Sequence, residues 1–162
     1  MDGLLEDILN LGYLGIFLFS LILNLIPFFS PSNIFISGGI GILFPTFNPI
    51  LVGFLVALGA SIAKTVHFVI SFFIGGFLKK KEKNKINNLE RKHTRYKFGM
   101  IAAFISAATP IPDDPIVIPL GLIRFSPIKF FAAYFLGKII VTLTGAHLGQ
   151  AFGLTLEQQL GQ

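Results

Sequence analysis

The chain has 162 residues, of which 53% are hydrophobic and 13% are charged, and its mean hydropathy is +0.76. A soluble domain carries about 25% charged residues, so this composition indicates an integral membrane protein. The sequence contains no cysteine, which excludes disulfides, zinc–thiolate sites and thiol chemistry. No Lys or Arg precedes Lys64, so the first apolar run lacks a basic leader and a secretory signal peptide is not expected.

The first apolar segment is interrupted. Leu11–Ile26 runs into "PFFSPSN", and apolar sequence resumes as Ile34–Phe44. Limbs of about 8 to 12 helical residues reach only about 12–18 Å, whereas the hydrocarbon core is about 30 Å thick. We therefore predict a re-entrant hairpin with its tip at Pro27–Asn33. Because the first limb is long, a full span over residues 11–26 remains an alternative.

A clean span follows at Pro49–Leu78, and a second runs from Pro127 to about Gly153. Between them, Phe98–Ala108 runs into "TPIPDDP" and resumes as Ile116–Ile123, which predicts a second hairpin with its tip at Pro110–Asp114. Nine of the thirteen Lys/Arg residues fall in residues 79–97. Basic residues collect on the cytoplasmic side of membrane spans, so this stretch is predicted as a cytoplasmic loop of a multi-pass protein of the cell membrane. Nucleic acid is not an expected partner, because these residues form a short tether between membrane segments.

The two halves share one order, and the opening proline is followed by glycines at equal spacings: Pro49, Gly59 and Gly75 correspond to Pro127, Gly137 and Gly153. Each half makes one net crossing, so the halves must be inverted. The predicted fold is an all-α integral membrane protein of two inverted repeats, each a re-entrant helical hairpin followed by a transmembrane helix. It forms one membrane domain, with residues 11–78 and 98–153 as its halves. Segments 1–10, 44–49 and 154–162 contain no Lys or Arg, which favours both termini outside.

The hairpin tips carry polar residues typical of helix starts. Asp114 before Pro115, and Ser32 with Asn33, can cap the helices that follow. Capping explains one polar residue per tip, but it does not explain Asp113 beside Asp114. Two adjacent carboxylates repel, so one of them is a candidate proton carrier.

A charged carboxylate inside a membrane needs a partner or water. The predicted partners are Lys64, deep in the first span, and Lys138, deep in the second; His67 shares a helix face with Lys64. Two interpretations stay open: a structural ion-pair network, or a solvated transport site that contains these pairs. No catalytic or metal-binding motif accompanies them, so no enzymatic activity, cofactor or metal is expected.

Two stretches resemble a known family. "LGYLGIFLFSLILNLIPFFSPSNIFISGGIG" (residues 11–41) resembles the first hairpin of the DedA family, also called VTT-domain or SNARE-associated Golgi proteins. Its members often read G-x-x-G-x-F, E-N, P-x-P-S-E and an apolar run to A-G. "TPIPDDPIVIPLGLIRFSPIKFF" (residues 109–131) is similar to the second hairpin of small archaeal-type members, which carry T-P-x-P-D-D and P-L-G. The resemblance covers roughly residues 11–153.

The resemblance implies the same fold and a transporter that moves a lipid or lipid-linked phosphate, such as a polyprenyl phosphate or a phospholipid, between leaflets. Proton coupling has also been proposed for the family. The expected partners are therefore membrane lipids and protons, and a homo-oligomer is compatible with the sequence. The alternatives are a proton- or cation-coupled exporter of small solutes and a non-transporting membrane scaffold.

Departures from the family pattern bear on headgroup binding. Leu23 and Asn33 stand where bacterial members have acidic residues. Many bacterial members carry arginines in the second hairpin that could bind a phosphate, whereas here Asp113 and Asp114 occupy that region and Arg124 lies only at its inner end. Positive potential would then come from the two buried lysines and from helix N-termini.

Overall fold

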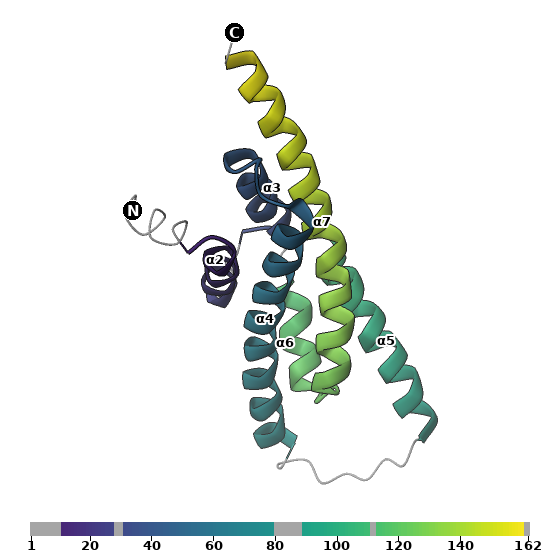
Figure 1. Cartoon of the computed structure of the whole chain (residues 1–162). Coiled ribbons are helices and arrows are strands. Elements are labelled where there is room, and N and C mark those ends of the chain that lie inside the picture. The colour runs from purple at the N-terminus through teal and green to yellow at the C-terminus, as the bar shows by residue number, and fades with distance from the viewer. Residues whose placement is uncertain (1–10, 28–30, 80–88, 111–112, 161–162) are drawn as a thin grey trace.

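A computed structural model describes residues 11–27, 31–79, 89–110 and 113–160 of the chain (Figure 1). Within these ranges, helices are the only extended regular elements, which confirms the predicted all-α class. The helices, in chain order, are α2 (Tyr13–Leu25), α3 (Asn33–Leu43), α4 (Pro49–Lys79), α5 (Leu89–Ala108), α6 (Asp114–Leu122) and α7 (Pro127–Leu160).

Helices α4 and α7 are the two elements of the described chain that are long and apolar enough to cross a membrane. Both begin at the predicted prolines, Pro49 and Pro127, because proline suits the first turn of a helix, where its missing N–H has no intrahelical partner. Helix α7 continues past Gly153 to Leu160. The residues after Gly153 are mainly leucine, glutamate and glutamine, which are strong helix formers.

The hairpin limbs are short helices, as predicted. Helices α2, α3 and α6 have 13, 11 and 9 residues, which corresponds to about 20, 17 and 14 Å at 1.5 Å per residue. Helix α5 differs from the prediction, since it begins at Leu89, inside the stretch predicted as a loop. Its first turns contain Glu, Lys and Arg, which form helices well, so the apolar limb extends into polar sequence. The central residues of both predicted tips lie outside the described residues.

The second limb of each hairpin packs mainly on the long helix of the other half. Helix α3 packs on α7, and α6 packs on α4, while the first limbs α2 and α5 pack on the long helices of their own halves, α4 and α7. Figure 1 shows α6 running between α4 and α7. The halves are therefore joined by an exchange of limbs.

Two matched pairs of glycines make these contacts close. A Cβ atom at Gly59 would meet the backbone of α2, and one at Gly137 would meet the backbone of α5. Likewise, a Cβ at Gly41 of α3 would meet the Ala146 carbonyl, and one at Gly121 of α6 would meet the Phe68 carbonyl. Only glycine lets the helix backbones approach this closely, which is the usual means of helix association in membranes.

These contacts repeat with a constant shift in residue number. The pair Gly59 and Gly137 and the pair Phe68 and Ala146 both differ by 78 residues, and each member of a pair makes the same kind of contact. The spacing of Gly59 and Gly137 from their prolines was noted in the sequence, and the structure shows that the two residues have equivalent neighbours.

Candidate functional site

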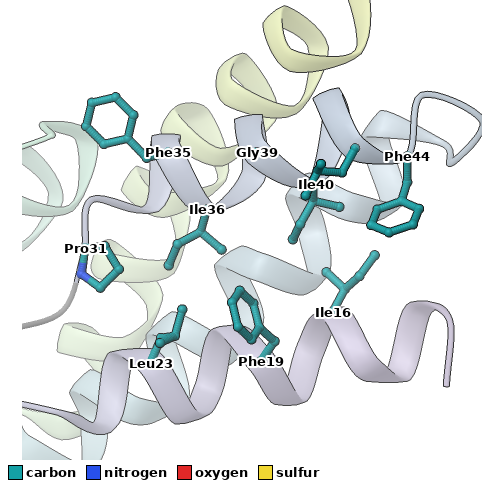
Figure 2. A pocket seen from close by; sticks show the side chains of 10 residues that line it. Ile16, Phe19, Leu23, Pro31, Phe35, Ile36, Gly39, Ile40 and Phe44 are labelled. Atoms are coloured by element: carbon teal, nitrogen blue, oxygen red, sulfur yellow. The ribbon is translucent and has the colours of Figure 1, made fainter. Parts of the chain in front are cut away.

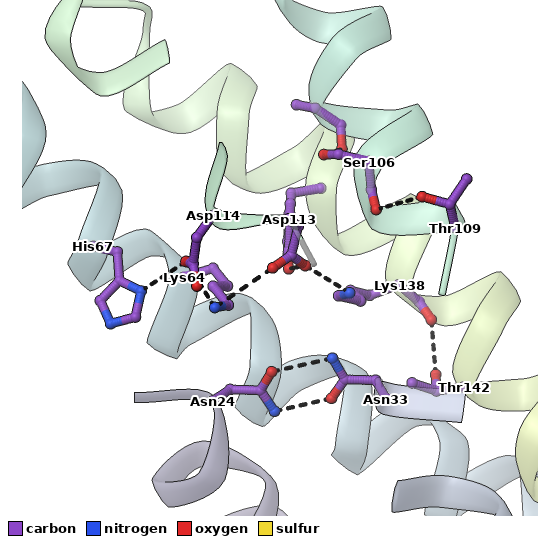
Figure 3. A network of polar contacts seen from close by, with 12 residues as sticks. Asn24, Asn33, Lys64, His67, Ser106, Thr109, Asp113, Asp114, Lys138 and Thr142 are labelled. Carbon is purple, nitrogen blue, oxygen red and sulfur yellow. Dashed lines mark hydrogen bonds and ion pairs between the residues drawn. The ribbon is translucent and has the colours of Figure 1, made fainter. Parts of the chain in front are cut away.

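A buried cluster of charged side chains lies where α6 begins. Lys64 Nζ of α4 is 2.8 Å from Asp114 Oδ1 and 3.5 Å from Asp113 Oδ1, and Lys138 Nζ of α7 is 2.8 Å from Asp113 Oδ2 (Figure 3). All four side chains are at most 5% exposed. The predicted pairing of two aspartates with two lysines from different long helices is confirmed.

His67 connects this cluster to the end of α2. Its Nδ1 lies 3.2 Å from Asp114 Oδ1, and its Nε2 lies 3.0 Å from the Leu25 carbonyl oxygen. A carbonyl only accepts hydrogen bonds, so Nε2 carries a hydrogen. The contact at Nδ1 then requires one more proton, either on the imidazole or on the carboxyl group. His67 and Asp114 together hold one proton more than a neutral imidazole beside a carboxylate.

This proton sets the formal charge of the cluster. The charges of Asp113, Asp114, Lys64 and Lys138 cancel, so the added proton leaves a charge of +1. We call these five residues, His67 included, the charged cluster. Together they could accept one negative charge from a ligand.

Tyr134 also belongs to this site, and the sequence prediction missed it. Its hydroxyl donates a hydrogen bond to Asp113 Oδ2, and Lys138 Nζ lies 5.2 Å from the centre of its ring. The side chain is fully buried. Tyr134, Lys138 and Thr142 recur every four residues on one face of α7, and this period is the signal that could have located the tyrosine.

The predicted capping of the hairpin helices is wrong. Asp113, rather than Asp114, occupies the N-cap position of α6, and no side-chain capping hydrogen bond forms there. Ser32 occupies the N-cap position of α3, also without a side-chain cap. The aspartates instead face the lysines, because a hydrogen bond between two charged groups is stronger than one to a neutral amide.

The first hairpin carries a buried pair of amides. Asn24 Nδ2 donates to Asn33 Oδ1 at 2.9 Å, and Asn33 Nδ2 donates to Asn24 Oδ1 at 3.1 Å. The Asn24 amide also donates to the Ser20 carbonyl oxygen at 2.8 Å. Asn24 was not predicted as a site residue, although Ser20 and Asn24 are polar residues one turn apart in an apolar helix. Since Leu25 binds His67, this amide pair adjoins the charged cluster (Figure 3).

Two predicted residues do not join either group among the described contacts. Ser32 takes part through its backbone carbonyl, which accepts the N–H groups of Phe35 and Ile36. Arg124 lies past the far end of α6 with a φ of 59°, and its guanidinium is 4.6 Å from the centre of the Phe72 ring. The structure therefore brings together Asp113, Asp114, Lys64, Lys138 and His67, places Asn33 in the amide pair, and leaves Arg124 apart.

The family of the chain follows from a comparison with known domains. A model of the VTT domain matches residues 30–151, about three quarters of the chain. The chain belongs to the DedA family. It is thus a membrane protein of this family, and the matched range contains the whole charged cluster. No curated protein and no solved structure matches the chain.

Proposed function

We propose that this DedA-family protein moves a phosphate-bearing lipid, either a polyprenyl phosphate or a phospholipid, between membrane leaflets, and that a proton is coupled to the movement. The observation that carries the proposal is the buried charged cluster at the start of α6, which draws one lysine from each long helix. The helix-start positions are filled by aspartates that cap nothing, so helix capping does not account for them.

Stability alone is a poor reason for this arrangement. Replacing a buried ion pair by apolar residues of similar volume is often neutral or stabilising, by about 1–4 kcal/mol. Ionisable residues at membrane depth are costly and commonly mark a path for a substrate or an ion. A formal charge of +1 suits one monoanionic phosphate group. The Ser61 hydroxyl, which is buried and has no hydrogen-bond partner among the described residues, lies one turn from Lys64 and could donate to such a group.

We also infer that the two halves are inverted repeats whose hairpins re-enter the membrane from opposite faces. The exchanged limbs and the glycine contacts shifted by 78 residues support this arrangement. In this topology the basic stretch between α4 and α5 is cytoplasmic, and both ends of the chain are outside. Both hairpin tips then approach the middle of the bilayer, where an irregular backbone is tolerated when protein or water covers it.

A second function is favoured by the proton between His67 and Asp114: export of a small solute driven by a proton or cation gradient. Such an exporter stops when the gradient is removed, whereas exchange of lipid between leaflets needs no gradient. A scaffold without transport would retain its function when the charged cluster is neutralised. We propose no catalytic reaction for either transporter.

Reconstitution into liposomes tests the proposal. We would measure leaflet-to-leaflet movement of a fluorescent phospholipid and of a polyprenyl phosphate, with and without a pH gradient. The wild type is compared with Asp113→Asn/Asp114→Asn and with Asp113→Asn/Lys138→Met, which removes one acid and one base and so keeps the formal charge balanced. Glu157→Gln, which neutralises an exposed carboxylate, is the control.

We expect movement of at least one lipid in the wild type and in Glu157→Gln, and its loss in both cluster variants. Movement that persists in a folded charge-balanced variant would remove the cluster from the lipid path. If no lipid moves, gradient-driven uptake of small solutes into the same liposomes becomes the test of the second function.

A further inference from the structure

Each hairpin contains an apolar groove between its two limbs. The first groove lies between α2 and α3, has a volume of about 390 Å³, and runs from Ile16 and Phe44 at one end to Leu23 and Pro31 at the other (Figure 2). The second lies between α5 and α6 and has a volume of about 530 Å³. Phe19 and Leu23 of α2 point toward Ile36 of α3 in Figure 2, so the groove walls are hydrocarbon side chains.

The two grooves occupy equivalent positions. Their walls on the second limb match with a shift of 80 residues: Ile36, Gly39 and Leu43 line the first groove, and Ile116, Pro119 and Ile123 line the second. The same shift relates Gly41 to Gly121, which make equivalent close contacts with the long helices. The apolar character of both walls is kept, although the residues differ.

The polar residues next to the grooves differ between the halves. The first groove ends beside the neutral amide pair, since it is lined by Leu23, the neighbour of Asn24. The second ends beside the charged cluster, since it is lined by Pro115, the neighbour of Asp114. The protein thus has two similar apolar sites and a single charged one, all meeting at the hairpin tips. An amphipathic ligand with one charged end and a hydrocarbon chain matches this layout.

We propose that the grooves are binding sites for the hydrocarbon tail of the lipid, one for each leaflet, with the headgroup held at the charged cluster. The inference rests on the proposed function. The tail lies in the groove of the starting leaflet before the headgroup passes and in the groove of the other leaflet afterwards. A second copy of this chain is the competing occupant, but the continuity of each groove with a buried polar site favours a ligand that has a polar end.

Selectivity in these grooves must come from packing and from the headgroup. Lipid tails are as apolar as the groove walls, so the hydrophobic effect does not favour transfer of a tail from the bilayer into the protein. An anionic lipid should therefore occupy the grooves more than a neutral lipid with the same tails. This dependence distinguishes a tail site from ordinary contact with the bilayer.

The chain has no tryptophan, so a single introduced tryptophan reports on one groove. We would place it at Phe19→Trp in the first groove, at Phe98→Trp in the second, and at Phe73→Trp on the exposed face of α4 as the control. Tryptophan fluorescence is then measured with small fractions of phosphatidylglycerol, or of diacylglycerol, brominated on the acyl chains. We expect brominated phosphatidylglycerol to quench both groove reporters several-fold more than the control, and brominated diacylglycerol to quench all three alike.

A groove-filling variant provides a second test. A Cβ atom at Gly39 meets nothing within 4 Å, so Gly39→Leu enters open groove space without displacing protein atoms. We expect Gly39→Leu to slow lipid movement and to reduce quenching at Phe19→Trp, while Leu14→Phe, on the lipid-facing side of α2, changes neither.

The outcomes separate the two proposals. Selective quenching without any lipid movement would retain the tail sites and overturn the transport proposal. Lipid movement that Gly39→Leu leaves unchanged, together with equal quenching at all three positions, would overturn the tail sites alone. Groove reporters that are shielded only at high protein density, with cross-linking across α2 and α3, would assign the grooves to contact between copies of the chain.

Discussion

The two hairpin tips occupy equivalent positions but use different chemistry. Asn33 is the first residue of α3, and Asp114 is the first residue of α6. Asn33 pairs with Asn24 of its own hairpin, and each amide satisfies the other. Asp114 has no such partner in its own hairpin among the described contacts and reaches Lys64 and His67 of the other half.

This difference shows how a duplicated plan can acquire one polar site. A neutral amide pair satisfies itself within one hairpin and needs no outside charge. A carboxylate at the same depth must be paired, so it recruits a lysine from each long helix and links the halves electrostatically. The first tip is therefore expected to act mainly as structure, and the second to carry the ligand.

The largest expected effect comes from unbalancing the charged tip. Lys64→Met removes the ammonium group that contacts both aspartates. Removing one partner from a buried ion pair commonly costs about 3–5 kcal/mol, because a charge is left buried without compensation. We expect a drop of this size in the free energy of unfolding, measured by denaturation in detergent micelles.

The matched control is Lys64→Met with Asp114→Asn, which restores the formal charge balance of the cluster. Most of the lost stability should return in this double variant, while lipid movement stays abolished. Equal stability of the single and double variants would contradict the buried pairing of Lys64 with Asp114.

The amide tip should respond less. Asn33→Leu leaves the Asn24 side-chain oxygen without the donor that it has in the wild type, and an unsatisfied buried polar group costs about 1–3 kcal/mol. The double change Asn24→Leu/Asn33→Leu removes both amides and should be nearly neutral. Lipid movement should persist in the double variant, and its loss would mean that the first tip also contacts the headgroup.

The sequence was informative where local chemistry decides the outcome. Pro49 and Pro127 open the long helices because proline suits a first helical turn. The pairing of the aspartates with Lys64 and Lys138 was predictable because charges at membrane depth require partners. The extension of α5 back to Leu89 was missed because a helix can continue from apolar into polar sequence without any break in propensity.

The rest of the site depends on contacts between distant segments. Capping was predicted for Asp114 and Ser32 from their neighbours in sequence, but tertiary partners outcompeted it at the aspartates. Tyr134 and Asn24 were missed because each acts on a residue of another helix. Only a helical period of polar residues in each helix pointed to them, and that signal does not identify the partner.

The smallest effect is expected at His67, which touches both tips. His67→Gln keeps a hydrogen-bond donor near the Leu25 carbonyl but cannot hold the proton shared with Asp114. The loss of one hydrogen bond predicts a decrease of about 0.5–1.5 kcal/mol in the free energy of unfolding. The folded wild type binds a proton here that an unfolded histidine releases above about pH 6.5, so wild-type stability should fall as pH rises. In His67→Gln this fall should be reduced, while Thr65→Ala, an exchange on the same helix outside the cluster, should keep the wild-type slope. Identical pH slopes for wild type and His67→Gln, measured by denaturation in detergent from pH 6 to 9, would falsify the shared proton.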